Sequence, residues 1–125
     1  MPKISKAAAS WVETLEGVFE GRFEDLGGYT AQFEHYLADN DPAELFRGLP
    51  GDRCQCPHWG VVLAGRLVYR YADGTEDIIE PGQAYYAPPG HLPVFVAGTE
   101  IVEFSPTDEF RRTAQAVLDN AAARA

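Results

Sequence analysis

The chain has 125 residues, and 19 acidic against 10 basic residues give it a formal net charge of −9. This length suits one domain with a core of its own, and we expect that domain to span residues 1–125. The acidic balance argues against nucleic acid and against anionic membrane surfaces as partners, because clustered Lys and Arg bind both.

No apolar run approaches the roughly 20 residues that cross a bilayer, and the N-terminus MPKISKAAASW lacks the apolar core of a signal peptide. We therefore expect a cytoplasmic protein. In that compartment Cys54 and Cys56 are expected to be thiols or metal ligands rather than a disulfide.

The N-terminal third of the chain has the weakest signals. Residues 1–17 are expected to form a loose arm, since small polar residues come first and two glycines then interrupt a helical stripe. From Val18 onward we expect extended structure, and residues 29–36 alternate in the manner of a strand. Asp41 and Pro42 then predict the start of a short helical turn, as its N-cap and first helical residue.

Strand signals recur at short intervals through the middle of the chain. No helix-length segment separates them, so the sheet is antiparallel, and residues 18–104 should close into a small barrel or sandwich. The strongest hairpin signal is Asp73-Gly74. From Pro57 on, the expected strands cover residues 59–63, 67–71, 76–79, 83–87, 94–96 and 100–104.

The C-terminal segment, residues 105–125, changes to a helical pattern. Ser105 and Pro106 predict an N-cap followed by proline at the first helical position. The apolar stripe of Phe110, Ala114, Val117 and Leu118 indicates that one face of a helix over about 106–121 packs on the barrel or on a partner.

Cys54, Cys56 and His58 stand at alternate positions, so in an extended strand their side chains share one face. On a flat strand the Cα atoms of Cys54 and His58 would be about 13 Å apart, beyond their combined reach of about 10 Å to one metal. They can share an ion only if the chain bends, for which Pro57 is a plausible cause. Cys56 and His58 need no bend.

Two motifs in this region resemble those of the cupin superfamily. The first is His58-Trp-Gly-Val-Val-Leu-Ala-Gly65-Arg-Leu, and the second is Gly82-Gln-Ala-Tyr-Tyr-Ala-Pro88-Pro-Gly90. The resemblance covers roughly residues 50–104. It implies an all-β fold, an antiparallel jelly-roll barrel that is commonly dimeric and holds any metal inside. The resemblance leaves open whether the chain is an enzyme; an enzyme would be metal-dependent and of the dioxygenase, isomerase or cyclase type.

The ligand positions depart from the usual cupin pattern of two histidines in His-x-His, a glutamate and a last histidine. His58 stands where the glutamate is usual. The His-x-His positions fall near Asp52 and Cys54, and the last histidine position is Pro93. The nearest candidate for that last ligand is His91, two residues earlier and on the same strand face.

We therefore predict that Cys56, His58 and His91 converge in the barrel lumen, with Cys54 as an optional fourth ligand. Thiolate and imidazole ligands favour a divalent transition metal, Zn²⁺ ahead of Fe, Ni or Cu, over Mg²⁺ or Ca²⁺. The competing interpretation is structural: cysteine is among the most buried residue types, and both histidines could be satisfied core residues.

Aromatic residues near these ligands could line a pocket for a small organic molecule. Alternation sends only one of Tyr85 and Tyr86 into the lumen. Glu103 lies in an otherwise apolar strand, where it is either solvated or an inward base or ligand. The predicted pocket residues are Trp59, Tyr85, Tyr86, Phe95 and Glu103.

Two functions remain open. The chain is either a metal-dependent enzyme acting on a small organic molecule, or a non-catalytic module that binds or senses a small ligand without a metal. An open sheet edge near residues 29–36, the amphipathic terminal helix and the cupin resemblance together predict a homodimer.

Overall fold

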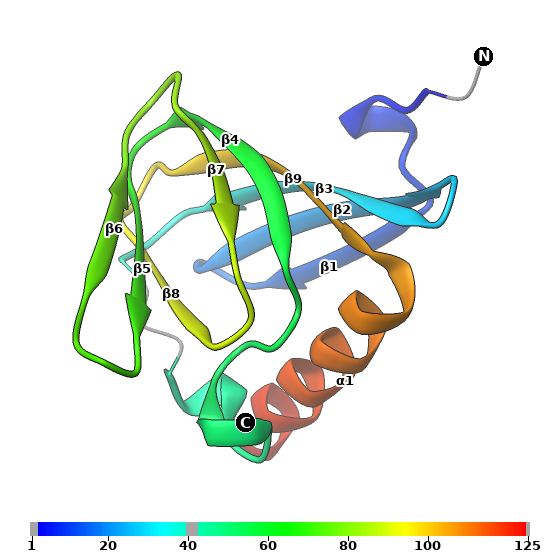
Figure 1. Ribbon diagram of the computed structural model, residues 1–125. Coiled ribbons are helices and arrows are strands. Elements are labelled where there is room, and N and C mark those ends of the chain that lie inside the picture. Colours follow the sequence, from blue (N-terminus) through cyan, green and yellow to red (C-terminus); the bar gives the residue numbers. More distant parts are fainter. Residues whose placement is uncertain (1–2, 40–42, 125) are drawn as a thin grey trace.

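The computed structural model describes residues 3–39 and 43–124 (Figure 1). The first three strands are β1 (Trp11–Leu15), β2 (Phe19–Leu26) and β3 (Tyr29–Tyr36). After the short 3₁₀ turns η2 (Ala43–Phe46) and η3 (Pro50–Asp52) come β4 (His58–Ala64), β5 (Leu67–Tyr71), β6 (Glu76–Ile79), β7 (Ala84–Ala87), β8 (His91–Phe95) and β9 (Glu100–Pro106). The chain also has a first 3₁₀ turn, η1 (Lys6–Ala8), and ends in the helix α1 (Thr107–Arg124).

Two antiparallel sheets face each other across the core. One has the strand order β1-β2-β3-β9-β4-β7 and the other the order β6-β5-β8. β9 is central to the larger sheet, where it pairs with β3 on one side and β4 on the other. The open edge expected near residues 29–36 is wrong, because β3 pairs with both β2 and β9. The predicted antiparallel barrel with a single C-terminal helix is confirmed.

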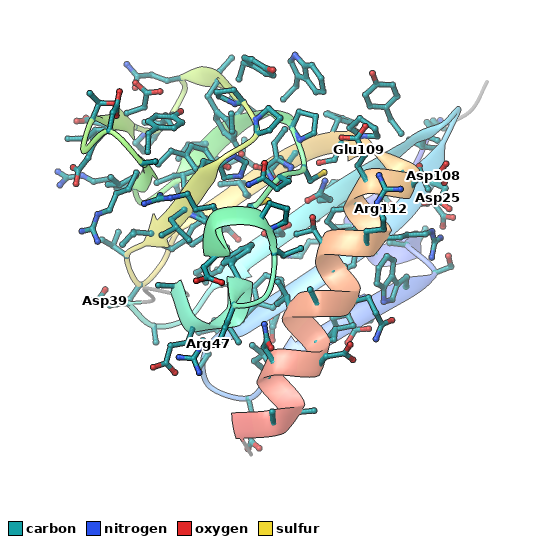
Figure 2. The ribbon with its side chains drawn as sticks, turned by 60° about the horizontal axis from the view of Figure 1, so that its bottom comes forward. Asp25, Asp39, Arg47, Asp108, Glu109 and Arg112 are labelled. Atoms are coloured by element: carbon teal, nitrogen blue, oxygen red, sulfur yellow. The ribbon has the colours of Figure 1, made fainter. Side chains whose placement is uncertain are left out.

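The core has two parts. Between the sheets, the largest fully buried side chains include Leu67, Tyr69 and Ile101. The second part lies under α1, where the apolar face of the helix meets the open end of the barrel: it comprises Phe23, Leu45, Phe46, Cys54, Cys56 and Phe110. Figure 2, viewed from that end, shows α1 lying across the barrel.

Hydrogen bonds hold both ends of α1, the first to the barrel and the second to the segment around η2. At its start, the Thr107 backbone N–H donates to the Gly28 carbonyl at 3.0 Å, and the Thr30 hydroxyl lies 3.1 Å from that of Thr107. Near its end, the Asn120 side-chain amide donates to the carbonyls of Leu45 and Arg47 at 2.7 and 2.9 Å. Among the described residues, neither α1 nor any shorter helix is long and apolar enough to cross a membrane.

The expected loose arm, residues 1–17, is wrong in its second half, because β1 is an edge strand paired with β2. The ring of Trp11 packs on Phe23 and Phe110 with centroids 4.8 and 5.8 Å away, which anchors the strand. Gly17, at φ 75°, belongs to the turn that joins the two strands. The sheet therefore starts at Trp11 rather than Val18.

The expected N-cap at Ser105 is also wrong, although the helix begins within one residue of the expected position. β9 continues through Pro106, and Ser105 pairs with Thr30 of β3, so α1 begins only at Thr107. Sheet pairing here prevails over a local capping signal, and it leaves the Ser105 side chain buried inside the barrel. The predicted cap at Asp41 and Pro42 lies outside the described residues.

Candidate metal centre

Three candidate ligands come together where the two sheets approach each other. Cys54 faces His91, the first residue of β8, in an isolated antiparallel bridge: the Cys54 N–H donates to the His91 carbonyl at 2.9 Å. After Pro57 the chain enters β4 at His58. The Cys54 sulfur and one ring nitrogen from each histidine all lie within 4.8 Å of one another, and all three residues are buried.

His91 presents an unprotonated nitrogen to this group. Its Nδ1 lies 2.6 Å from the Pro88 carbonyl oxygen, which can only accept, so we assign the ring proton to Nδ1. The Nε2 lone pair is then buried and has no hydrogen-bond partner among the described residues. Burial, reinforced by the neighbouring His58, lowers the pKa of His91 to about 3, so the ring is neutral. An unpaired buried nitrogen is costly, and a metal ion would satisfy it.

His58 is oriented in the same way by a different partner. Its Nδ1 lies 2.6 Å from the Ser105 hydroxyl. With the Gln32 amide oxygen facing that hydroxyl at 2.6 Å, the Gln32 amide nitrogen donates to Glu34 and Glu103 at 2.9 and 3.0 Å. Ser105 then donates to Gln32 and accepts from His58, which leaves Nε2 of His58 unprotonated. Burial lowers the pKa of His58 to about 3.

The Cys54 sulfur completes the donor set. It lies 3.4 Å from Nε2 of His58. Donors bound to one tetrahedral Zn²⁺ at about 2.1 Å (nitrogen) and 2.3 Å (sulfur) would be about 3.6 Å apart, close to this separation. Burial raises the pKa of the thiol, and a coordinated metal would offset that by stabilising the thiolate. One thiolate and two imidazoles therefore fit Zn²⁺, with one position left for water or a ligand.

The sequence ranked Cys56 ahead of Cys54 as a ligand, whereas the structure brings Cys54, and not Cys56, to the two histidines. Cys56 is buried, but its sulfur contacts the Pro57 carbonyl at 3.5 Å and is not in the donor group. The expectation that Cys56 needs no bend assumed a regular strand, whereas the chain bends at Cys56 before β4 begins. That bend brings Cys54 to His58. Both cysteines are free thiols.

Glu103 points into the barrel, so the solvated alternative is wrong for this residue. It is buried, and its Oε1 accepts hydrogen bonds from the hydroxyls of Tyr69 and Tyr85 at 2.8 and 2.6 Å. Burial raises the pKa of Glu103 to about 7. On the adjacent strand β3, burial and the charge of Glu103 raise the pKa of Glu34 to about 8.

The predicted aromatic pocket residues divide between the two faces of the sheets. Phe95 is buried and Tyr85 points inward to Glu103, whereas Trp59 and Tyr86 remain 42% and 51% exposed. Alternation along β4 explains this, because an inward His58 places Trp59 outside. Trp59 is paired with Tyr86 in the sheet, and their rings form an outer contact with centroids 5.1 Å apart.

A mostly apolar cavity of about 150 Å³ adjoins the donor group, lined by residues of both sheets and α1. A second cavity of about 110 Å³ shares part of its wall. The first cavity reaches both Cys54 and His58. Its other polar lining residues are Glu13, Gln32, Glu34, Tyr36, Tyr69, Glu103 and Thr113.

Sequence reasoning did not single out Ser105, Gln32 or Glu34. The alternation of residues 29–36 does place Thr30, Gln32, Glu34 and Tyr36 on one face, which was the available signal. That face is polar, and period-two patterning normally assigns a polar face to solvent. Here the polar face lines the lumen.

Comparison with known proteins finds similarity at the level of structure. No family model and no curated protein matches this sequence. An RmlC-like cupin from Shewanella frigidimarina covers 85% of this chain and 92% of its own at 16% identity, with a TM-score of 0.54. A protein of unknown function from Rhizobium leguminosarum covers 84% and 94% at 21% identity, with a TM-score of 0.55. The structure of FeII HppE matches at 11% identity and a TM-score of 0.51 over 70% of this chain and 50% of its own. The motifs, the topology and these structures agree: this chain has the cupin fold.

Proposed function

We propose that Cys54, His58 and His91 bind a divalent transition metal, Zn²⁺ ahead of Fe, Ni or Cu, and that the adjoining cavity holds a small organic molecule. The observation that carries this proposal is the Nε2 atom of His91, which is buried without a hydrogen-bond partner among the described residues and close to two other donors. Native proteins rarely leave such an atom unpaired.

The surroundings of the ligands support the proposal. Metal-binding histidines usually donate their second ring N–H to a carbonyl or a similar acceptor, which fixes the ring and its tautomer. His91 does so to Pro88 and His58 to Ser105. The fold is compatible with a metal, since one structural neighbour is FeII HppE.

A metal bound by three protein ligands would supply a Lewis acid with a position for water or for part of the organic molecule. The chain itself supplies the other requirements of an enzyme. Apolar side chains from α1 and both sheets line most of the cavity. Glu103, held by two tyrosine hydroxyls, can accept or donate a proton at the cavity wall. We therefore favour a metal-dependent enzyme.

The second candidate is a metal-free module that only binds a small ligand. The mostly apolar wall of the cavity favours it, because such a wall can hold an apolar molecule without assistance from a metal. Metal content distinguishes the two candidates.

The test is elemental analysis of protein purified without added metal, then incubated with Zn²⁺ and freed of excess. We expect one equivalent of metal per chain. His91→Ala should lose most of it, because losing one of three ligands weakens binding steeply. His35→Ala is the matched control, since His35 lies outside the donor group and contacts Glu100 at 3.9 Å. Trace metal in the wild type, or equal content in both variants, would refute the metal site.

A further inference from the structure

We propose that the cavity selects molecules whose polar end donates hydrogen bonds and carries no negative charge, small organic amines above all. This inference rests on the proposed function, because it assumes that the cavity holds an organic molecule. It concerns the part of the cavity wall formed by Glu34 and Glu103.

The two carboxylates form one acceptor surface. Glu34 projects from β3 and Glu103 from β9, and the Gln32 amide nitrogen donates to both at 2.9 and 3.0 Å. Every described partner of these carboxyl groups is a donor. Above pH 8 both groups are ionised, and an ionised carboxylate has about four acceptor positions, so capacity to accept remains. Three tyrosine hydroxyls contribute donors: Tyr36 to Glu34, and Tyr69 and Tyr85 to Glu103.

The charges on the cavity wall all have the same sign. Its acidic lining residues are Glu13, Glu34 and Glu103, and none of the described lining residues is Lys or Arg. A ligand carboxylate at Glu34 and Glu103 would lose its hydration and meet like charge, which is unfavourable on both counts. An ammonium group there would instead form charge-assisted hydrogen bonds.

A ligand that carries a carboxylate could instead bind the candidate metal. With Cys54 ionised, a divalent ion would keep one net positive charge, to which a carboxylate could bind directly. An acid would therefore bind at the donor group and an amine at the glutamates. These two outcomes can be separated by experiment, because only the second depends on Glu34.

The size and remaining lining of the cavity fix the rest of the molecule. A cavity of about 150 Å³ with apolar walls is large enough for a single ring. Aromatic side chains provide much of that wall: Trp11, Phe19, Phe23, Phe46, Phe95 and Phe110. The preferred ligand therefore combines a ring-sized apolar body with one donating end.

Three probes that share one ring and differ in the polar end test this selection: benzylamine, benzyl alcohol and benzoate. Binding is measured by calorimetry and by NMR chemical-shift changes, on the zinc-loaded and the metal-free protein. We expect benzylamine to bind at least tenfold more tightly than benzoate, with benzyl alcohol between them. Above pH 8, where Glu34 is ionised, Glu34→Gln should reduce the preference for the amine by about tenfold, since it removes one carboxylate charge from the cavity wall.

Glu100→Gln is the matched control, because Glu100 is also acidic but lies outside the cavity lining, beside His35. It should leave the preference unchanged, and thermal unfolding verifies that both variants fold. Benzoate binding as tightly as benzylamine, or equal losses in the two variants, overturns the inference and leaves the proposed function standing. If none of the probes binds at millimolar concentration, the small-molecule part of the proposed function fails and the inference fails with it. If the protein binds no metal but still prefers the amine, only the metal part of the proposed function fails.

Discussion

Single hydrogen bonds decide whether the three donors can share a metal ion. The Pro88 carbonyl holds the proton of His91 on Nδ1, and Ser105 does the same for His58. Both rings therefore present Nε2 to the Cys54 sulfur. If either proton stood on Nε2, that nitrogen would be a donor and could not bind a cation.

Cys54→Ser should weaken Zn²⁺ binding at least tenfold, because a neutral hydroxyl replaces a thiolate ligand. Cys56→Ser is the matched control: Cys56 is equally buried, but its sulfur contacts the Pro57 carbonyl rather than the histidines. Competition with a chromophoric chelator measures both affinities. A larger loss in Cys56→Ser would show that the metal uses the other cysteine.

The sequence named His58 and His91 as candidate ligands because their positions relative to the cupin motifs could be counted. It ranked Cys56 ahead of Cys54, whereas the donor group contains Cys54, because the ranking depends on a bend that spacing alone does not reveal. The place of Ser105 beside His58 could not be predicted from the sequence for another reason. Its local context, Ser-Pro before two acidic residues, indicates a helix cap, and only the pairing of β9 with β3 reveals its place inside the barrel.

At the scale of elements, the turns between strands are the most predictable part of the chain. The Ala64-Gly65 turn links β4 to β5, and Gly65 has φ 80° with a tight surrounding: a Cβ there would lie 2.5 Å from the Cα of Thr99. The Asp73-Gly74 turn links β5 to β6, and Gly74, at φ 87°, has open space around it.

Gly65→Ala should therefore destabilise the fold by about 2–5 kcal/mol, combining left-handed strain with overpacking. Gly74→Ala should cost only about 1–2 kcal/mol, since strain is its only penalty. Urea unfolding followed by circular dichroism measures both. Similar losses in the two variants would mean that the contact with Thr99 relaxes without cost.

β1 is a strand that could not be predicted from the local sequence. Its residues belong to a helical stripe that Gly17 and Gly21 interrupt, so the local sequence did not indicate a strand before Val18. The strand forms because it pairs with the edge of β2 and because the Trp11 ring packs on Phe23 and Phe110. Both partners are distant in sequence, so tertiary packing makes the choice.

At the scale of the whole molecule, the outer face of the larger sheet carries an aromatic cluster. Tyr29, Trp59, Tyr86 and Phe104 are each more than 40% exposed. The Trp59 ring contacts those of Tyr86 and Tyr29, with centroids 5.1 and 6.0 Å away. Contiguous apolar surface of this kind commonly marks an interface.

We therefore predict a homodimer, with a mass by light scattering of about twice 13.7 kDa. Trp59→Lys should shift the equilibrium toward the monomer, because it places a charge in the aromatic cluster. Arg70→Lys, on the other sheet, is a conservative control. A single species at the monomer mass at micromolar concentration would contradict the prediction.

The hydrogen bonds that hold both ends of α1 bear on how fast a molecule could enter and leave the cavity. The helix forms one wall of the cavity, and Asn120 ties it to η2 at a distance in sequence from every candidate ligand. If the cavity holds a molecule as we propose, Asn120 would affect how fast that molecule exchanges, whereas Cys54, His58 and His91 would bind the metal. A substitution at Asn120 could then change the rate of exchange and leave the proposed metal ligands intact, so exchange rate and specificity could evolve separately in this barrel.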